Sequence, residues 1–479
     1  PIFMSSFNNK QVSAKLVLPS SVNRIVRAKP DTRNKAGGKA FSLTNEYKLA
    51  FSLVASFLEP EFYRDRKQAV KEIEDLVAKV DPLFAAKAAV LTRTTYGNRS
   101  TTHLVAAVIA YLVKGETWTK NFFNKVVYRV DDASEIMAAY LGMYGKPVPN
   151  SLKKGLAKAM SKFSTYQLAK YKGENKGVKL VDLFNIVHPK PSEENATAFK
   201  NLIEGNLASE GTWEAMLSAA GQTGTPAEKE KAKKKVWKTL LETNKLGYFA
   251  LLKNLRNIMQ TGDEGIVDLA AKQLVNKDQI LKSLVLPFRY LTAQKELEKT
   301  QDPFSRTLLK AVNDALDIAM SNVPVFPGKT LVALDRSGSM GQTSDPSSPA
   351  SIGSLFAAVI AKANNADLMV FDDKADNINV NLSDSLFTVT KGIQAHFTYG
   401  GTDFREIFRK AARKYDRIII LSDMQAWIGG GAPTKEFGEY CSRTNARPKL
   451  YSFDLKGLGT IQFPQENVYA LAGFSEKTM

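Results

Sequence analysis

The stretch that decides the fold is Leu331-Val332-Ala333-Leu334-Asp335-Arg336-Ser337-Gly338-Ser339. Four apolar residues predict a short buried strand, and three oxygen-bearing side chains then follow at alternate positions. Because alternate side chains of an extended chain point to the same side, Asp335, Ser337 and Ser339 can converge on one point. Gly338 lets the loop turn tightly around that point. Open α/β sheets bind ligands at the carboxyl ends of their strands, so the stretch predicts a binding site there.

Two further oxygen donors follow later in the chain. Thr402 comes directly after Gly400-Gly401, and Asp423 ends the apolar run of residues 418–421. Carboxylate and hydroxyl oxygens suit a hard cation, so we expect Mg²⁺ or another divalent cation on Asp335, Ser337, Ser339, Thr402 and Asp423. With only two carboxylates, the cation would keep affinity for an acidic oxygen. The pattern therefore favours capture of an acidic protein partner over activation of water.

The residues around this site alternate between β-rich and helical runs. The expected strands are Thr330–Leu334, Asp367–Phe371, Arg417–Leu421, Lys449–Phe453 and, as an edge strand, Asn467–Leu471. The expected helices between them are Ser351–Ala363, Phe404–Lys414 and Lys435–Ser442. Such alternation indicates βαβ units and a largely parallel sheet. The order of DxSxS, GGT and a strand-final aspartate resembles the metal-ion-dependent adhesion site of von Willebrand A domains. Residues 328–479 are thus predicted to be an α/β, Rossmann-like von Willebrand A domain.

Residues 44–323 have a helical pattern throughout, with apolar residues at three- and four-residue spacing. Short connections predict antiparallel helix pairs in series, an α-solenoid with HEAT-like repeats, although a large irregular helical domain would show the same pattern. The predicted helices include Tyr47–Leu58, Arg66–Val80, Leu104–Val113, Ala133–Tyr144, Leu152–Tyr166, Ala196–Leu207, Lys231–Thr243, Tyr248–Met259 and Ser305–Ala319. Two prolines in residues 323–328 mark the domain boundary. Residues 1–43 are polar and basic and are expected to form an N-terminal arm.

The positive charge of the chain is concentrated before the α/β domain. Residues 1–320 hold 49 Lys and Arg against 32 Asp and Glu, a net charge of +17, whereas residues 321–479 have a net charge of +1. This asymmetry predicts an anionic partner, either nucleic acid or an acidic membrane surface. No apolar run reaches the ~18 residues needed to span a bilayer. With one cysteine, Cys441, and no apparent signal peptide, we expect a cytoplasmic protein.

One stretch of the helical region carries a more specific resemblance. Lys170-Tyr171-Lys172 is followed by an acidic-leucine segment and by His188-Pro189-Lys190-Pro191. This KYK…HxKP pattern, the NRSTTHLVAA segment of residues 98–107 and the C-terminal domain resemble the Ro autoantigen family, whose helical region is called the TROVE module. The resemblance covers residues 40–479 and is typical of a bacterial or phage-type member.

Membership would imply that the helical repeats close into a ring with the C-terminal domain. It would also imply a monomer that binds small non-coding Y-like RNA and the single-stranded 3′ ends of misfolded RNA, and that works with an exoribonuclease such as polynucleotide phosphorylase. The RNA-binding residues would be Lys170, Tyr171, Lys172, Lys176, His188 and Arg99. Lysines neutralise phosphates, and aromatic rings stack on unpaired bases.

The sequence leaves open the role of a second basic run and an alternative function. Lys231, Lys233, Lys234, Lys235 and Lys238 form a basic run that is either a second RNA contact or a solvated helix face. The alternative function is a metal-dependent protein-adhesion module without an RNA role. An enzyme is not expected, because no paired carboxylates, HExxH motif or nucleophile–base arrangement stands out.

Overall fold

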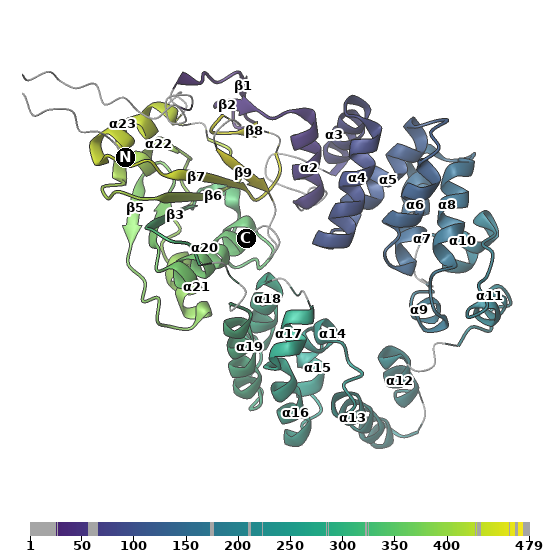
Figure 1. Ribbon diagram of the computed structural model, residues 1–479. Coiled ribbons are helices and arrows are strands. Elements are labelled where there is room, and N and C mark those ends of the chain that lie inside the picture. The colour runs from purple at the N-terminus through teal and green to yellow at the C-terminus, as the bar shows by residue number, and fades with distance from the viewer. Residues whose placement is uncertain are drawn as a thin grey trace, which may run out of the picture.

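A computed structural model describes residues 25–472 except 26, 56–65, 173–176, 209–211, 223, 284, 286, 321–322, 324, 427, 429–432, 459 and 465–467. The described chain has a helical part, whose helices run through residue 319, and an α/β part, whose first strand begins at residue 330 (Figure 1). Among the described residues, no helix is both long and apolar enough to cross a membrane.

The first arm of the helical part packs around one hydrophobic core, in which α5 is buried along almost its whole length. The main contacts join alternate helices along the chain, such as α6 with α8 and α5 with α7. Its elements are α2 (Asn45–Val54), α3 (Arg66–Lys79), α4 (Pro82–Leu91), the π-helical turn η1 (Thr92–Tyr96), α5 (Ser100–Leu112), α6 (Thr119–Val126), α7 (Val130–Tyr144), α8 (Asn150–Met160), α9 (Thr165–Lys170), α10 (Leu180–Val187) and α11 (Ala196–Ile203).

The second arm belongs to a different core, which continues into the α/β domain. Its helices are α12 (Trp213–Ala220), α13 (Pro226–Glu242), α14 (Tyr248–Lys253), α15 (Leu255–Met259), α16 (Glu264–Leu274), α17 (Lys277–Ser283), α18 (Pro287–Glu298) and α19 (Ser305–Ala319). The series of packed helices confirms the predicted α-solenoid.

Two of the predicted helices are each divided in the structure. Residues 152–166 contain the end of α8 and the start of α9, and Ser164 caps α9 by accepting a hydrogen bond from the backbone N–H of Gln167. Ser164 and Gln167 form a capping box, a pattern by which the sequence alone can indicate the start of a helix. Residues 248–259 break at Asn254, which separates α14 from α15.

The α/β domain has a six-stranded sheet in the order β5-β4-β3-β6-β7-β9. All neighbouring pairs are parallel except β4 and β5, and β9 is an edge strand as predicted. One face packs on α20 and α21, and the other packs on α22 and α23. The elements are β3 (Thr330–Asp335), η3 (Gly338–Met340), α20 (Pro349–Asn364), β4 (Asp367–Phe371), β5 (Ala375–Ile378), α21 (Leu386–Gln394), α22 (Arg405–Lys410), β6 (Arg417–Ser422), α23 (Thr434–Thr444), β7 (Lys449–Asp454), β8 (Thr460–Ile461) and β9 (Tyr469–Ala472).

The N-terminal segment differs from the predicted arm. Residues 1–24 lie outside the described residues, but β1 (Thr32–Arg33) and β2 (Lys39–Ser42) form a hairpin. Strand β2 then pairs antiparallel with β8, with Phe41 opposite Ile461, and both side chains are buried. Pairing between segments so distant in sequence leaves no local pattern to read.

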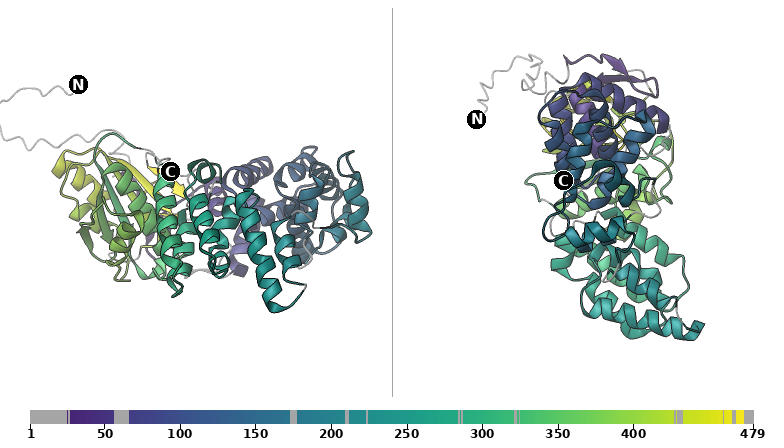
Figure 2. Two further views of the ribbon diagram at one scale, coloured as in Figure 1. Left: turned by 90° about the horizontal axis from the view of Figure 1, so that it is seen from below. Right: turned by 90° about the vertical axis from the view of Figure 1, so that its right-hand side faces the viewer.

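Both ends of the helical part meet the α/β domain. Helix α2 lies against β9, while α18 contacts α20 and α19 contacts α21. The helices between them describe an arc that leaves the domain along α3–α11 and returns along α12–α19 (Figure 1). Seen from below and from the side, the arc and the domain form one flat, elongated body (Figure 2). The chain thus closes on itself as a ring, as the resemblance implied.

Candidate functional site

The five predicted cation ligands are all buried at one end of the sheet. Strand β3 ends at Asp335, and neighbouring β6 ends at Ser422, directly before Asp423. The side chain of Ser422 donates a hydrogen bond to Oδ2 of Asp335 at 2.6 Å, and the backbone N–H of Ser337 donates to its Oδ1 at 2.8 Å. The hydroxyl oxygens of Ser337 and Ser339 lie 3.3 Å apart. The carboxyl ends of two parallel strands therefore bring these side chains together.

The loop that carries Thr402 lies against the DxSxS loop. The backbone N–H of Gly338 donates to the carbonyl of Gly400 at 3.1 Å, and that of Tyr399 donates to the carbonyl of Arg336 at 3.1 Å. A side chain at Gly338 would meet the carbonyl oxygen of Tyr399, so a glycine permits this close approach. His396, the only nearby base that the sequence offered, is exposed and meets Arg336 only through its backbone carbonyl.

The site concentrates buried negative charge. Burial, and then the neighbouring charge of Asp423, raise the pKa of Asp335 well above its usual value. Burial also raises the pKa of Asp423, although the ammonium of Lys456 and the hydroxyl of Ser339 oppose that rise. Lys456 is itself buried and donates from Nζ to the carbonyl oxygen of Ser339 at 3.0 Å. The protein thus places one positive charge next to two carboxylates that repel each other.

The donors present fit a divalent cation. Among the described residues, Oδ2 of Asp423 has no hydrogen-bond partner although it is fully buried, and such an atom is costly unless something binds it. Two carboxylates and up to three hydroxyls are the oxygen donors that Mg²⁺ accepts. When bound, the cation would supply charge neutralisation and a coordination position for an oxygen of another molecule.

The N-terminal segment supports the loop that carries Asp423. The side chain of Asn34 donates to the carbonyl of Ala426, and the backbone N–H of Lys35 donates to Oε1 of Gln425 at 2.7 Å. The backbone N–H of Gln425 in turn donates to Oδ1 of Asp423 at 3.1 Å. The hairpin that closes the ring therefore also orders the candidate metal site.

A second cluster occupies the helical part, around the expected KYK stretch. Lys170 ends α9, and its Nζ lies 5.9 Å from the ring centroids of both Tyr166 and Tyr171. The guanidinium of Arg129 lies 4.7 Å from the ring centroid of Tyr171. Lys172 instead donates from Nζ to the carbonyl of Leu207, so its ammonium holds a neighbouring loop. Lys170 and Tyr171 thus form a half-buried surface of positive charge and aromatic rings.

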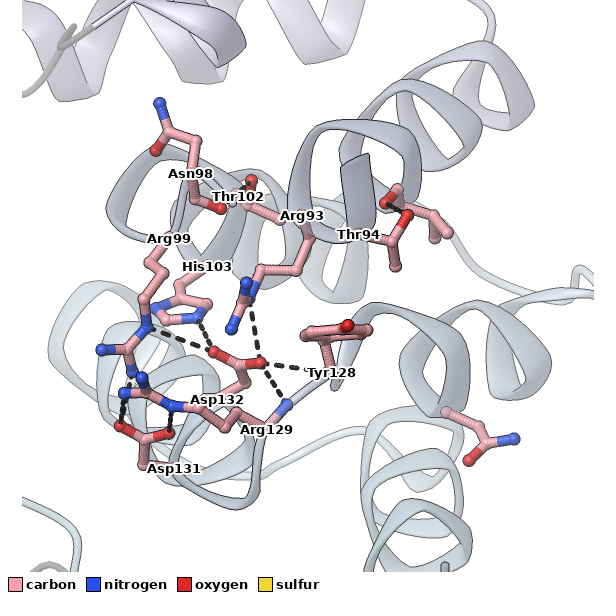
Figure 3. Close-up of polar contacts among 12 residues, drawn as sticks. Arg93, Thr94, Asn98, Arg99, Thr102, His103, Tyr128, Arg129, Asp131 and Asp132 are labelled. Carbon is pink, nitrogen blue, oxygen red and sulfur yellow. Dashed lines mark hydrogen bonds and ion pairs between the residues drawn. The ribbon is translucent and has the colours of Figure 1, made fainter. Parts of the chain in front are cut away.

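Beneath this surface, the fully buried Asp132 organises three helices (Figure 3). Its carboxylate accepts from Nε of Arg93 at 2.9 Å and lies 2.8 Å from Nε2 of His103. It also accepts from the backbone N–H groups of Tyr128 and Arg129, which caps α7. Burial alone would raise the pKa of Asp132, but the hydrogen bond with His103 and the charge of Arg93 hold it well below its usual range.

The adjacent Asp131 arranges the outer guanidiniums (Figure 3). It accepts two hydrogen bonds from Arg129, at 2.7 and 2.6 Å, and one from Nη2 of Arg99 at 2.6 Å. Burial opposes ionisation of Asp131, yet the bonds and charges of Arg129 and Arg99 lower its pKa. Three arginines therefore share two carboxylates, and the cluster keeps a net positive charge beside Tyr128, a residue that is 61% exposed.

These contacts revise the predicted RNA residues. Arg99 donates to Asp131 and Asp132 and is part of this network, while 31% of its side chain stays exposed, so its role in RNA binding stays a prediction. His188 is exposed at the end of α10, where it has a positive φ of 49°. Lys176 lies outside the described residues. The ammonium of Lys170 lies near the ring of Tyr171, whereas the ammonium of Lys172 donates to the carbonyl of Leu207.

Sequence reasoning missed Arg93, Tyr128, Arg129, Asp131 and Asp132. The one available signal was Arg129-Val130-Asp131-Asp132, a charged run directly before an apolar helix. Its arginine partners come from segments 30 or more residues away, so only the fold reveals the network. The basic run of residues 231–238 lies on α13, away from this cluster (Figure 1).

Comparisons with known proteins agree with this architecture. The family model of the TROVE domain matches residues 48–219 and 206–317, and that of the Ro60 vWA domain matches residues 329–477. The chain is 23% identical to the RNA-binding protein RO60 of Deinococcus radiodurans, over 87% of this chain and 88% of that protein. The crystal structure of the Deinococcus radiodurans RO (RSR) protein superposes with a TM-score of 0.63 and 19% identity, covering 90% of this chain and 97% of the other.

Telomerase protein component 1 of Rattus norvegicus is a partial relative. It is 20% identical over 51% of this chain, but the match spans only 13% of that protein. The two family models, by contrast, cover the helical part and the α/β domain in the order found here. The chain therefore belongs to the Ro family, with a TROVE domain followed by a Ro60-type von Willebrand A domain.

Proposed function

We propose that this protein binds RNA through the TROVE surface formed by Lys170, Tyr171, Arg129 and Tyr128. The observation that carries the proposal is the stacking of guanidinium and ammonium groups over tyrosine rings. Positive groups bind phosphates, and rings with an accessible face stack on unpaired bases. The relative named as an RNA-binding protein and the net charge of +17 before the α/β domain support the same reading.

We infer a small structured RNA of the Y type on this surface, together with single-stranded 3′ ends of misfolded RNA at the ring. An exoribonuclease such as polynucleotide phosphorylase would act on RNA presented in this way, and the protein itself would be a cytoplasmic scaffold without catalytic activity. The family and the positions of Lys170 and His188 support this inference.

A second proposal concerns the α/β domain, where Oδ2 of Asp423 is buried without a hydrogen-bond partner among the described residues. We propose that Mg²⁺, or another divalent cation, binds Asp335, Ser337, Ser339, Thr402 and Asp423. A partner carboxylate would complete its coordination. This would be an adhesion function separate from RNA binding.

The proposed function is tested by ultraviolet crosslinking of the protein in its own cells, followed by sequencing of the attached RNA. We expect a small structured RNA to be enriched, with crosslinks at tyrosines of the helical part. If the protein crosslinks no more RNA than an unrelated basic protein does, the proposal is contradicted. If the protein binds an acidic protein in the presence of Mg²⁺ but crosslinks no RNA, the adhesion function alone is favoured.

A further inference from the structure

A cavity of about 440 Å³ lies between α12, α13 and α15, distant in sequence from both sites described above. Lys233, Lys234 and Trp237 line it from α13, and Asn257, Gln260 and Thr261 line it from the end of α15 and the turn that follows. The spacing of Lys233, Lys234 and Trp237 places them on one face of α13. A cavity of this size falls in the range that holds one small molecule or one nucleotide.

The lining combines a ring, amides, two ammonium groups and the carboxylate of Glu230. Trp237 is only 4% exposed, and the centroid of its ring lies 6.5 Å from that of Trp213. The side chain of Asn257 donates to Asn254 at 2.9 Å, which leaves its oxygen able to accept. The buried indole gives the cavity an apolar floor, and the neighbouring amides can recognise the edge of a nucleobase.

The charge of the cavity comes from α13. Lys234 pairs with Glu230 at 3.2 Å, whereas Lys233 has no ion-pair partner among the described residues. The stem of Lys233 lies against Gly221, where even a β-carbon would be only 3.1 Å from its Cε. Three further lysines of α13 are exposed, Lys231, Lys235 and Lys238, of which Lys238 lies 3.9 Å from Glu242.

We propose that this cavity takes one unpaired nucleotide of a single-stranded RNA segment. The base lies against Trp237 and meets Asn257 and Gln260, the phosphate binds Lys233, and the outer lysines of α13 bind the neighbouring phosphates. The inference rests on the proposed RNA-binding function and adds to it a nucleotide site on α13 and α15, separate from the Lys170 surface. A duplex does not fit, because a cavity of this volume admits one nucleotide and not a helix.

The test uses the full-length protein and a single-stranded hexamer of uridines, followed by tryptophan fluorescence. We expect the hexamer to quench the fluorescence, and we expect Trp237→Phe to lose most of that quenching. Lys233→Ala and Gln260→Ala should each weaken hexamer binding by about three- to tenfold, as expected for one contact to a phosphate or base. Lys310→Ala, which removes a 79% exposed lysine from α19, is the matched control and should leave binding unchanged.

Parallel titrations separate this inference from the proposed function. Lys233→Ala should keep its affinity for a structured RNA, and Lys170→Ala should keep its affinity for the hexamer. Hexamer binding without structured-RNA binding would support the cavity and contradict the Lys170 surface. The inference is overturned if Lys233→Ala binds the hexamer like the parent protein, or if uridine monophosphate binds as tightly as the hexamer. Equal unfolding temperatures of the variants show that the fold is intact.

Discussion

The guanidinium of Arg129 lies 4.7 Å from the ring centroid of Tyr171 while its Nε and Nη2 donate to the carboxylate of Asp131. One arginine thereby joins the buried network to the surface that carries Lys170. Because both contacts orient the same planar group, the position of the ring depends on Asp131. The RNA surface that we propose is therefore built from inside the helical part.

Replacing Arg129 tests this connection. Arg129→Ala should weaken binding of a structured RNA by about fivefold or more, because it removes a cation from the surface and a support from Tyr171. Arg129→Lys keeps the charge but loses the two-point contact with Asp131, so it should restore binding only in part. Gel shifts at fixed salt measure both. Arg413→Ala, on the exposed face of the α/β domain, is the control, and wild-type affinity in Arg129→Ala would refute the connection.

Asp132 should dominate the stability of the first arm. Asp132→Asn leaves Arg93 and His103 beside a neutral group, and we expect a loss of about 3–5 kcal/mol in the free energy of unfolding. The pKa of Asp132 is lowered in the folded protein, so its contribution is present above the unfolded pKa of ~3.9 and is lost only as the pH falls further.

Urea unfolding of both proteins between pH 7.5 and pH 9, above the ordinary imidazole pKa of ~6.5, measures this contribution. The difference in unfolding free energy between them should stay constant across that window. A difference that disappears within it, or one no larger than that of the exposed pair variant Asp75→Asn, would show that the carboxylate is not held in this way.

The site in the α/β domain makes a prediction about Mg²⁺. Lys456 places a buried ammonium beside Ser339 and Asp423, where it competes with a cation for the same negative field. Lys456→Met should therefore tighten Mg²⁺ binding by about tenfold, which corresponds to ~1.4 kcal/mol. Ser339→Ala removes one ligand and should weaken it.

The rise of the unfolding temperature with Mg²⁺ concentration reports this affinity without any activity assay. Ser347→Ala, an exposed serine of the same domain, is the matched control. An equal Mg²⁺ effect in the parent protein, Ser339→Ala and Lys456→Met would show that the cation does not bind at these residues.

Residues that act close together in sequence were predictable. Asp335, Ser337 and Ser339 follow one strand, so their convergence depends only on local geometry and on the apolar run before them. The helical part was equally readable, because burial of one face imposes its spacing on the sequence. Even the start of α9 was signalled by Ser164 and Gln167.

Residues brought together by the fold were not predictable. Arg93, Arg99 and Asp132 look like separate surface charges in the sequence, yet they meet because α5 and α7 pack side by side. The pairing of Phe41 with Ile461 is likewise visible only in the folded chain. A polar residue in an apolar helix can be buried with a partner or exposed to water, and sequence alone does not distinguish the two.

The most direct test of the central claim is the affinity of Lys170→Ala/His188→Ala for a structured small RNA, measured by gel shift over a series of salt concentrations. Lys172 is left unchanged because its ammonium holds the carbonyl of Leu207. We expect at least a tenfold loss, and a salt slope smaller by about 0.7–0.9 for the lost phosphate contact. Lys435→Ala, 80% exposed in the α/β domain, should bind like the parent protein. A double variant with the parent's affinity and salt slope would contradict the account.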